Sequence, residues 1–323
     1  MSTLKKELEN LIEKKLVTVK KYPQDGLNVY KYSKAVFFKN LWHKSAYLLK
    51  ARGLVLDDTG VIVQHPFDKV FNFNENGTGQ DIALDKQVVA VEKLNGFLAC
   101  ITKHPNKNEL LISTTGSLDS DFVKMIDELI TPEQRKNMLS YFKDNNVTFM
   151  FEAIHPNDPH IISYNESEQG LWLIGAREKQ ENSKNYKEDR LDAIALNLGF
   201  KRPHWFVDSF ENVLKKIKTD KIEGYMVLDN ETHNSLLKMK TNYYLTAKFL
   251  GRMGVNNITM MYENTDVFKD KVEEEFFELV DILISKYSKD ELLNMDNDKK
   301  VDIVKQLIEH LNIYRTENKF KLL

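Results

Sequence analysis

Residues 86–103 read KQVVAVEKLNGFLACITK, two β-rich runs joined by a lysine and a glycine three positions apart. A lysine near the end of a strand can act as a nucleophile toward phosphorus. The glycine would remove the Cβ that crowds an incoming triphosphate. Spacing alone selects nothing, because the chain has four such pairs: Lys50–Gly53, Lys93–Gly96, Lys221–Gly224 and Lys248–Gly251. The segments around each pair must therefore decide among them.

Further runs of four to eight residues, rich in Val, Ile, Leu and Thr, lie on both sides of Lys93 and predict strands. They cover residues 53–58, 59–64, 109–115, 148–154 and 170–176. Residues 224–230 and 235–240 predict a hairpin across the polar stretch 231–234. Helical periodicity occupies residues 2–16, with Ser2 as a plausible N-cap, and residues 118–143 and 186–198. This pattern predicts an α+β fold rich in antiparallel strands, not a regular βαβ alternation.

The strand pattern stops after about residue 243. Apolar residues then recur every three or four positions, which is typical of helices. They are Phe268, Val272, Phe276, Leu279, Leu283, Val301, Val304 and Ile308. We therefore expect a domain at residues 1–243 and a small all-helical C-terminal domain at residues 244–323. Glu273–Glu275 would form the solvated face of a helix.

Composition is that of a globular chain: 323 residues, 42% hydrophobic and 29% charged, with a net charge of −2. The single cysteine, Cys100, excludes an intramolecular disulfide and a CxxC metal knuckle. The start, MSTLKKELEN, has no apolar signal region, and no stretch has the length of a membrane span. The expected location is therefore cytoplasmic.

Ordered segments select Lys93 from the four lysines. In chain order they cover residues 51–76, 93–96, 148–164, 171–177, 222–228 and 236–245. With these segments the chain resembles the covalent nucleotidyltransferase superfamily of ATP-dependent ligases and capping enzymes. Within it, the chain is most similar to ATP-dependent RNA ligases of the bacteriophage tRNA-repair type. The resemblance runs from about residue 28 to 250 and implies a nucleotidyltransferase (adenylation) domain.

The resemblance implies that Lys93 becomes adenylated and that Lys238 and Lys240 contact the α-phosphate. The two lysines are two positions apart, so on a strand both ammonium groups lie on one face. Cations there would neutralise charge on the α-phosphate and on the leaving pyrophosphate. The full implied nucleotide site is Tyr32, Arg52, Lys69, Phe71, Lys93, Gly96, Glu152, Glu223, Lys238 and Lys240.

Two carboxylates complete this implied site. Glu152 would hold the ribose hydroxyls, and Glu223 would serve the metal-assisted steps. Both are candidate ligands of Mg²⁺ or Mn²⁺, partly through water. Lys93, Glu223, Lys238 and Lys240 are the candidate catalytic residues, with ATP as co-substrate.

The chain departs from its relatives at two positions. Asn95 stands where the relatives usually carry an acid, which leaves the site one negative charge poorer. Thr115 stands where the tRNA-repair type has a lysine, so contacts to the triphosphate would be weaker or differently arranged.

Three other functions compete with an RNA ligase. A DNA ligase or an mRNA capping enzyme would usually carry a β-barrel after the paired lysines, whereas residues after Lys240 are helical in period. A catalytically silent module that binds RNA ends would need no nucleophile. The expected partner is RNA with 5′-phosphate and 3′-OH ends, with an end-healing kinase or phosphatase as a possible second partner.

Some residues carry weaker expectations. His155 and His160 flank two prolines and are best interpreted as a polar loop, not a metal site. Phe151 and Trp172 could stack on adenine or pack in the core. The C-terminal helices would act in RNA selection and not in chemistry, through Lys286, Lys289, Lys299 and Lys300.

Overall fold

The computed structural model describes residues 2–321. The chain divides into two compact units. Unit 1 consists of Met1–Val70, Leu94–Trp205 and Leu228–Ser235, and unit 2 of Phe71–Lys93, Phe206–Val227 and Leu236–Leu323. The sequence boundary after residue 243 falls within unit 2, and separate folding of residues 244–323 stays a prediction. No helix in the described part of the chain is long and apolar enough to cross a membrane.

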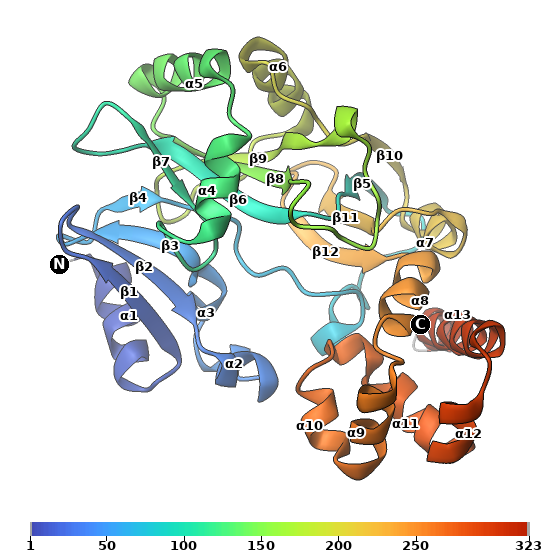
Figure 1. Ribbon diagram of the computed structural model, residues 1–323. Helices are drawn as coiled ribbons and strands as arrows, with labels where there is room; N and C mark the ends of the chain where they lie inside the picture. Colours follow the sequence, from blue (N-terminus) through green and yellow to red (C-terminus); the bar gives the residue numbers. More distant parts are fainter. Residues whose placement is uncertain (1, 322–323) are drawn as a thin grey trace. The chain divides into compact units, whose positions relative to one another are not determined.

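The first sheet of unit 1 is an antiparallel meander in the order β1-β2-β3-β4 (Figure 1). Its strands are β1 Val17–Tyr22, β2 Leu27–Tyr32, β3 Arg52–Asp57 and β4 Ile62–Gln64. Ser2 caps α1 Thr3–Glu13 by accepting a hydrogen bond from the Lys5 N–H, as the sequence predicts. Three short helices connect β2 to β3: α2 Lys34–Phe38, η1 Trp42–Lys44 and α3 Tyr47–Lys50.

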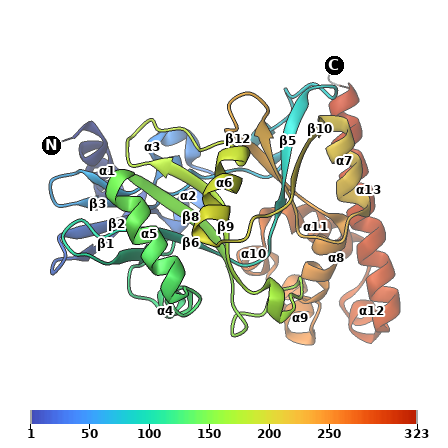
Figure 2. The same ribbon diagram turned by 90° about the horizontal axis from the view of Figure 1, so that it is seen from above.

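The second sheet of unit 1 has the order β7-β6-β8-β9. Its strands are β6 Phe97–Lys103, β7 Leu110–Ser113, β8 Val147–Ile154 and β9 Gly170–Glu178. Helices α4 Asp121–Glu128, α5 Pro132–Asp144 and α6 Glu188–Leu198 share one apolar core with this sheet, and Figure 2 shows them beside it. The short helix η3 Glu166–Glu168 precedes β9.

The predicted helical stretch over residues 118–143 is present, and it consists of two helices, α4 and α5. Thr131 starts the second helix as a capping box with Gln134, and Pro132 occupies its first turn. Proline favours the first turn of a helix and disrupts an interior, so the chain breaks before it.

Unit 2 is built on a sheet in the order β10-β5-β11-β12. The strands are β5 Gln87–Lys93, β10 Trp205–Ser209, β11 Gly224–Asp229 and β12 Ser235–Lys240. β11 and β12 are neighbours in the sheet and are joined at Asp229–Asn234, which confirms the predicted hairpin. Helix α7 Phe210–Thr219 packs its apolar face against β5, β11 and β12. The short helix η2 Glu75–Gly77 precedes β5.

Helices follow β12, and no further strand occurs in the described residues up to 321. They are α8 Asn242–Leu250, α9 Val255–Glu263, α10 Thr265–Lys269, η4 Glu274–Phe276, α11 Phe277–Lys286, α12 Lys289–Asn294 and α13 Asn297–Lys321. Figure 2 shows α13 running beside α8. The periodic residues Phe268–Leu283 therefore do not form one helix, since the chain turns between α10 and α11 and only the short η4 lies there.

Candidate active site

Lys93 and Glu223 form an ion pair in unit 2. Lys93 is the last residue of β5, and Glu223 directly precedes the neighbouring strand β11. The Lys93 Nζ lies 2.8 Å from Glu223 Oε1, with 24% of the lysine side chain and 5% of the glutamate side chain exposed. The sheet order thus brings together two residues that lie 130 positions apart in the sequence.

The backbone of Glu223 is fixed by the end of β12. Gly224 has φ +159°, and a Cβ there would lie 1.9 Å from the carbonyl oxygen of Met239. Thr241, which caps α8, donates its N–H to the Glu223 carbonyl at 2.9 Å. A larger residue at position 224 would force β12 away, so the glycine is required by close backbone packing.

The second carboxylate oxygen of Glu223, Oε2, accepts no hydrogen bond from the described residues. This oxygen is also buried. A buried acceptor without a partner is costly, so its retention is typical of a site that receives a ligand or an ion. Glu223 therefore offers one oxygen to Lys93 and a second to an incoming group.

Lys238 and Lys240 lie on the same face of β12, as predicted. The alternate residues Leu237 and Met239 are buried in the core of unit 2. The segment that contains Phe71 runs beside this strand: the Lys238 N–H donates to Phe71 O at 3.0 Å, and the Phe73 N–H donates to Lys238 O at 2.9 Å. Phe71 is thus attached by its backbone to the strand that carries the paired lysines.

Lys240 is paired with a carboxylate from the C-terminal helices. Its Nζ lies 2.5 Å from Glu275 Oε1, and both side chains are 9% exposed. Burial lowers the pKa of Lys240, but the carboxylates of Glu275, Glu223 and Glu273 outweigh it, so the pKa lies above its ordinary value. The expectation that Glu273–Glu275 forms a solvated helix face is wrong for Glu273 and Glu275, because both bind cations of unit 2.

Gly96 and Glu152 are joined in unit 1, where β6 and β8 pair with Leu98 opposite Glu152. The Gly96 N–H donates to Glu152 Oε1 at 2.9 Å. A Cβ at Gly96 would lie 2.3 Å from the Ala153 carbonyl oxygen. Close packing of the protein backbone is therefore a further reason for this glycine, and room for a triphosphate stays a prediction.

Asn95 connects the same turn to the loop after β8. Its Oδ1 accepts the Ile162 N–H at 3.1 Å, and its own N–H donates to the Tyr164 hydroxyl at 2.8 Å. Asn95, which stands where the relatives usually carry an acid, therefore has a structural role through its side-chain amide.

Tyr32 and Lys69 belong to a cluster with two aromatic residues in unit 1. Lys69 Nζ lies 5.3 Å from the ring centre of Phe37 and 5.4 Å from that of Trp42. Tyr32 meets Trp42 edge to face, with ring centres 4.8 Å apart. Cation–π contacts of this kind orient a lysine without neutralising it. The sequence analysis did not select Phe37 and Trp42. The available signal was the aromatic-rich stretch between the two implied site residues Tyr32 and Arg52.

Arg52 starts β3 next to the loop that contains Thr115. Gly53 has φ +89°, and a Cβ there would lie 2.8 Å from the Thr115 Cα. Lys31 is opposite Arg52 on β2, and its Nζ lies 3.6 Å from where a Gly116 Cβ would be. The loop at Thr115 therefore has one cationic neighbour, Lys31 of β2, although it carries no lysine itself.

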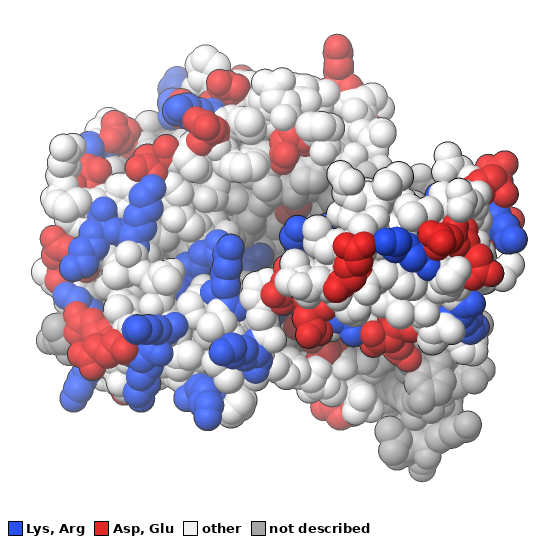
Figure 3. Space-filling view, turned by 60° about the horizontal axis from the view of Figure 1, so that its bottom comes forward, with Lys and Arg blue, Asp and Glu red and all other residues white. Residues whose placement is uncertain are grey.

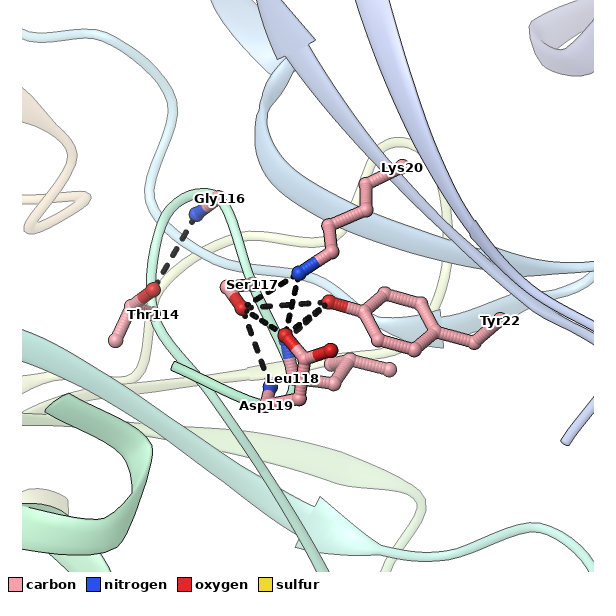
Figure 4. Close-up of polar contacts among 7 residues, drawn as sticks. All are labelled: Lys20, Tyr22, Thr114, Gly116, Ser117, Leu118 and Asp119. Atoms are coloured by element: carbon pink, nitrogen blue, oxygen red, sulfur yellow. Dashed lines mark hydrogen bonds and ion pairs between the residues drawn. The ribbon is translucent and has the colours of Figure 1, made fainter. Parts of the chain in front are cut away.

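Polar contacts from β1 anchor the far end of this loop (Figure 4). Tyr22 donates its hydroxyl to Asp119 at 3.0 Å and accepts the Leu118 N–H at 2.9 Å. Lys20 forms an ion pair with Asp119, which also accepts a hydrogen bond from Ser117. These contacts fix the loop between Thr114 and Asp119 against the first sheet.

The remaining candidates have contacts within the protein. Phe151 is fully buried in the core of the second sheet, which favours the packing alternative. Trp172 donates its Nε1–H to Glu168 O at 2.8 Å and carries Lys201 over its ring. His155 pairs with Glu128, and His160 with Asp158.

The implied metal ligands lie in different units, Glu152 in unit 1 and Glu223 in unit 2. Within the described residues, no group of three or more His, Cys, Asp or Glu side chains is arranged to hold a metal ion. Tyr32, Arg52, Lys69, Gly96 and Glu152 belong to unit 1, and Phe71, Lys93, Glu223, Lys238 and Lys240 belong to unit 2.

Solved structures with a similar fold are ligases. An archaeal ATP-dependent RNA ligase (form 2) is 13% identical, with a TM-score of 0.59 and coverage of 97% of this chain and 78% of that one. A putative ATP-dependent DNA ligase from Aquifex aeolicus is 11% identical, with a TM-score of 0.58 and coverage of 98% and 80%. At these identities the likeness shows the fold, a mixture of helices and antiparallel sheets.

The family comparison covers the segments that carry the candidate site. No curated protein sequence matches the chain. The family model described as RNA ligase matches residues 50–252, which include every candidate site residue except Tyr32. The match extends over more than half of the chain, and the chain therefore belongs to this RNA ligase family.

Proposed function

We propose that this RNA ligase uses ATP to join a 5′-phosphate RNA end to a 3′-OH end through a lysyl-AMP on Lys93. The observation that supports it best is the ion pair between Lys93 and the buried Glu223. A lysine held by a carboxylate at the end of a strand has both a fixed position and a proton acceptor beside it.

In the first step, the Lys93 amine attacks the α-phosphorus of ATP. An N–P bond forms, the bond to the bridging oxygen breaks, and pyrophosphate leaves. Glu223 Oε1 is placed to accept the lysine proton, because it lies 2.8 Å from Nζ. The 5′-phosphate of RNA then takes the AMP from Lys93. Finally, the RNA 3′-OH attacks the 5′-phosphorus and releases AMP as the phosphodiester forms.

Two cationic side chains of unit 2 would stabilise the negative charge of the phosphates. Lys238 and Lys240, on one face of β12, would stabilise negative charge that develops on the α-phosphate. Phe71, attached by its backbone to the same strand, is proposed to contact the nucleotide.

Unit 1 contributes the other nucleotide contacts that we propose. Glu152, oriented by Gly96, would accept hydrogen bonds from the ribose hydroxyls. Arg52 and Lys69 would bind the triphosphate, and Tyr32 would line the nucleotide near them. The aromatic rings of Phe37 and Trp42 orient the Lys69 ammonium for this role.

A divalent cation fits Glu223. The buried Oε2 without a described hydrogen-bond partner is a free ligand position, and a carboxylate oxygen is a ligand that Mg²⁺ and Mn²⁺ accept. When bound, the ion supplies charge neutralisation to the phosphates. Glu152 is the second proposed ligand, and phosphate oxygens and water would complete the coordination.

The RNA backbone is proposed to contact an N-terminal lysine surface. Figure 3 shows Lys and Arg side chains gathered over the N-terminal elements. The exposed members between residues 14 and 44 are Lys14, Lys15, Lys20, Lys21, Lys31, Lys34, Lys39 and Lys44. Only one acidic residue, Asp25, occurs within these bounds. This local excess of positive charge suits a polyanion, although the whole chain has a net charge of −2.

The proposal also covers the C-terminal residues and a possible partner enzyme. Residues 244–323 would form a helical domain that assists in RNA selection. An end-healing kinase or phosphatase would supply 5′-phosphate and 3′-OH ends where RNA cleavage leaves other ends.

Incubation with α-labelled ATP and Mg²⁺, followed by denaturing electrophoresis, tests the mechanism. Wild-type protein should acquire label, and Lys93→Ala should not. Lys221→Ala is the matched control, because the exposed Lys221 also precedes a glycine by three positions and should leave labelling unchanged. Lys93→Ala should retain some sealing of RNA that is already 5′-adenylated, since that step needs no lysine nucleophile. Normal labelling of Lys93→Ala would contradict the assignment.

A second arm separates the ligase from a capping enzyme and a DNA ligase. ATP should label the protein better than GTP at equal concentration. Stronger labelling by GTP would favour a capping enzyme, and equal joining of all-DNA ends would favour a DNA ligase.

A further inference from the structure

Besides the ion pair between Lys93 and Glu223, unit 2 contains an ion pair between Lys240 of β12 and Glu275. This pair is as buried as a core contact, with 9% of each side chain exposed. Lys93–Glu223 and Lys240–Glu275 are thus two ion pairs of unit 2 in which the glutamate side chain is no more than 9% exposed. The pairs interact, because the charge of Glu223 also acts on Lys240.

Contacts of the neighbouring residues hold Glu275 in place. Its neighbour Phe276 is buried against Phe249 of α8, with ring centres 5.2 Å apart. On the other side, Glu273 binds Lys248 at 2.7 Å and Arg252 at 3.3 Å. Arg252 also donates to the Lys271 carbonyl at 2.9 Å. Residues 271–276 are thus fastened to α8, the helix that begins directly after β12.

We propose that Glu275 is a positioning residue for Lys240, and that it keeps this ammonium away from Glu223. The proposal rests on the proposed function. With Glu275 present, each lysine has its own carboxylate, and Glu223 stays available to Lys93 and to a cation. Without Glu275, the buried Lys240 would need a new counter-charge, and Glu223 and Glu273 are the carboxylates that already act on it. Glu273 is paired with Lys248 and Arg252, which leaves Glu223 as the carboxylate that Lys240 would draw upon.

The C-terminal helices therefore take part in the adenylation step. This inference differs from the sequence-based hypothesis that they act in RNA selection and not in chemistry. Glu275 lies 35 residues beyond Lys240, in a segment outside the matched family region. The Glu275 carboxylate, from outside the matched region, thus holds Lys240, which lies within it.

Single-turnover formation of lysyl-AMP by Glu275→Gln tests the inference. Glutamine keeps the shape and removes the charge, so adenylation should fall at least about 10-fold. Glu275→Asp, which keeps the charge on a shorter stem, should recover part of the rate. Glu263→Gln is the matched control: it removes the exposed ion pair with Lys289 in the same C-terminal helices but leaves Lys240 paired, so the rate should stay within about twofold.

A double-mutant cycle separates positioning from a loss of folding. Lys240→Gln and Glu275→Gln should be strongly non-additive, because each single change removes the same pair. Thermal unfolding of each variant checks that the compared proteins are folded. Independent, additive losses would overturn the inference.

Two further outcomes are decisive. Faster adenylation by Glu275→Gln would mean that Glu275 inhibits Lys240, and a rate equal to wild type would mean that it has no role. Either result overturns the inference while wild-type labelling leaves the proposed function intact. Absence of lysyl-AMP in folded wild-type protein, with ATP and Mg²⁺, would instead reject the proposed function.

Discussion

The backbone N–H of Gly96 donates to the carboxylate of Glu152 across β6 and β8, at 2.9 Å. One glycine thus performs two tasks in unit 1. It permits contact with the Ala153 carbonyl, and it orients the carboxylate that we propose to hold the ribose. The lysine–glycine spacing in the sequence therefore has a structural basis that does not involve the nucleotide.

Gly96→Ala should disrupt this contact. The added Cβ would lie 2.3 Å from a backbone oxygen, so β6 or β8 must shift, at a cost of about 1–3 kcal/mol of unfolding free energy. Urea unfolding measures the loss. Gly251→Ala is the control, because it has the same spacing from a lysine but φ −58° and no Cβ contact closer than 3.5 Å. Equal losses in both variants would contradict the steric explanation.

Asn95 should tolerate aspartate better than alanine. Aspartate keeps an oxygen that accepts the Ile162 N–H, whereas alanine leaves this donor without its partner. Removing one partner of a buried hydrogen bond costs about 1–3 kcal/mol. Limited proteolysis of the loop over residues 155–164 and urea unfolding should therefore distinguish the variants, with Asn95→Ala the more sensitive. Equal behaviour would show that the side-chain contact is unimportant.

His65 should make the protein less stable in acid. Burial, and then the positive charge of Arg177, lower the pKa of His65 from 6.5 to about 4. Between these values the unfolded chain binds the proton and the folded protein does not. This contribution to stability is therefore complete above pH 6.5 and is lost as the pH falls to about 4, by up to about 3 kcal/mol. Unfolding midpoints of His65→Asn should depend less on pH across this window; an unchanged dependence would contradict the assignment.

Much of the strand framework follows from the sequence, because buried strands such as β5, β6 and β8 appear as unbroken apolar runs. β1 was missed, since it alternates apolar residues with Thr and Lys and has only one fully buried position. β2 was missed as well, although its first four residues are buried. Helix α7 was missed too, although Ser209 caps it and Phe210, Val213, Leu214 and Ile217 mark its buried face. In two stretches with a continuous helical period, residues 118–143 and 268–283, the backbone turns and the chain forms separate helices, which the period alone does not reveal.

The candidate site was predictable only where the sequence preserves an ordered motif. Lys93 and Glu223 belong to such motifs, and their 2.8 Å contact agrees with that assignment. Glu275 could not be found in this way. A charged run within a helical pattern indicates a solvated face, and only tertiary packing places Glu275 against Lys240.

The last prediction concerns which lysines contact RNA. The sequence suggested Lys286, Lys289, Lys299 and Lys300. Lys289 is paired with Glu263 at 2.8 Å, and in the N-terminal surface Lys20 is likewise paired with Asp119. Exposed lysines of the N-terminal surface are denser, and we expect them to contribute more to binding. Removing one lysine that binds a phosphate should reduce the slope of log affinity against log salt by about 0.7 for single-stranded RNA.

Two triple variants compare the surfaces directly: one changes Lys34, Lys39 and Lys44 to Ala, and the other changes Lys286, Lys299 and Lys300 to Ala. The N-terminal variant should lower the salt slope by up to about 2, while lysyl-AMP formation stays at the wild-type rate. The C-terminal variant should change the slope less. RNA binding measured by fluorescence anisotropy over a salt series gives both slopes, and labelling with ATP gives the control. A larger change of the slope in the C-terminal variant would show that the helices after β12 make the main RNA contacts. Each lysine that binds an RNA phosphate releases the counterion of that phosphate, wherever the lysine lies in the chain.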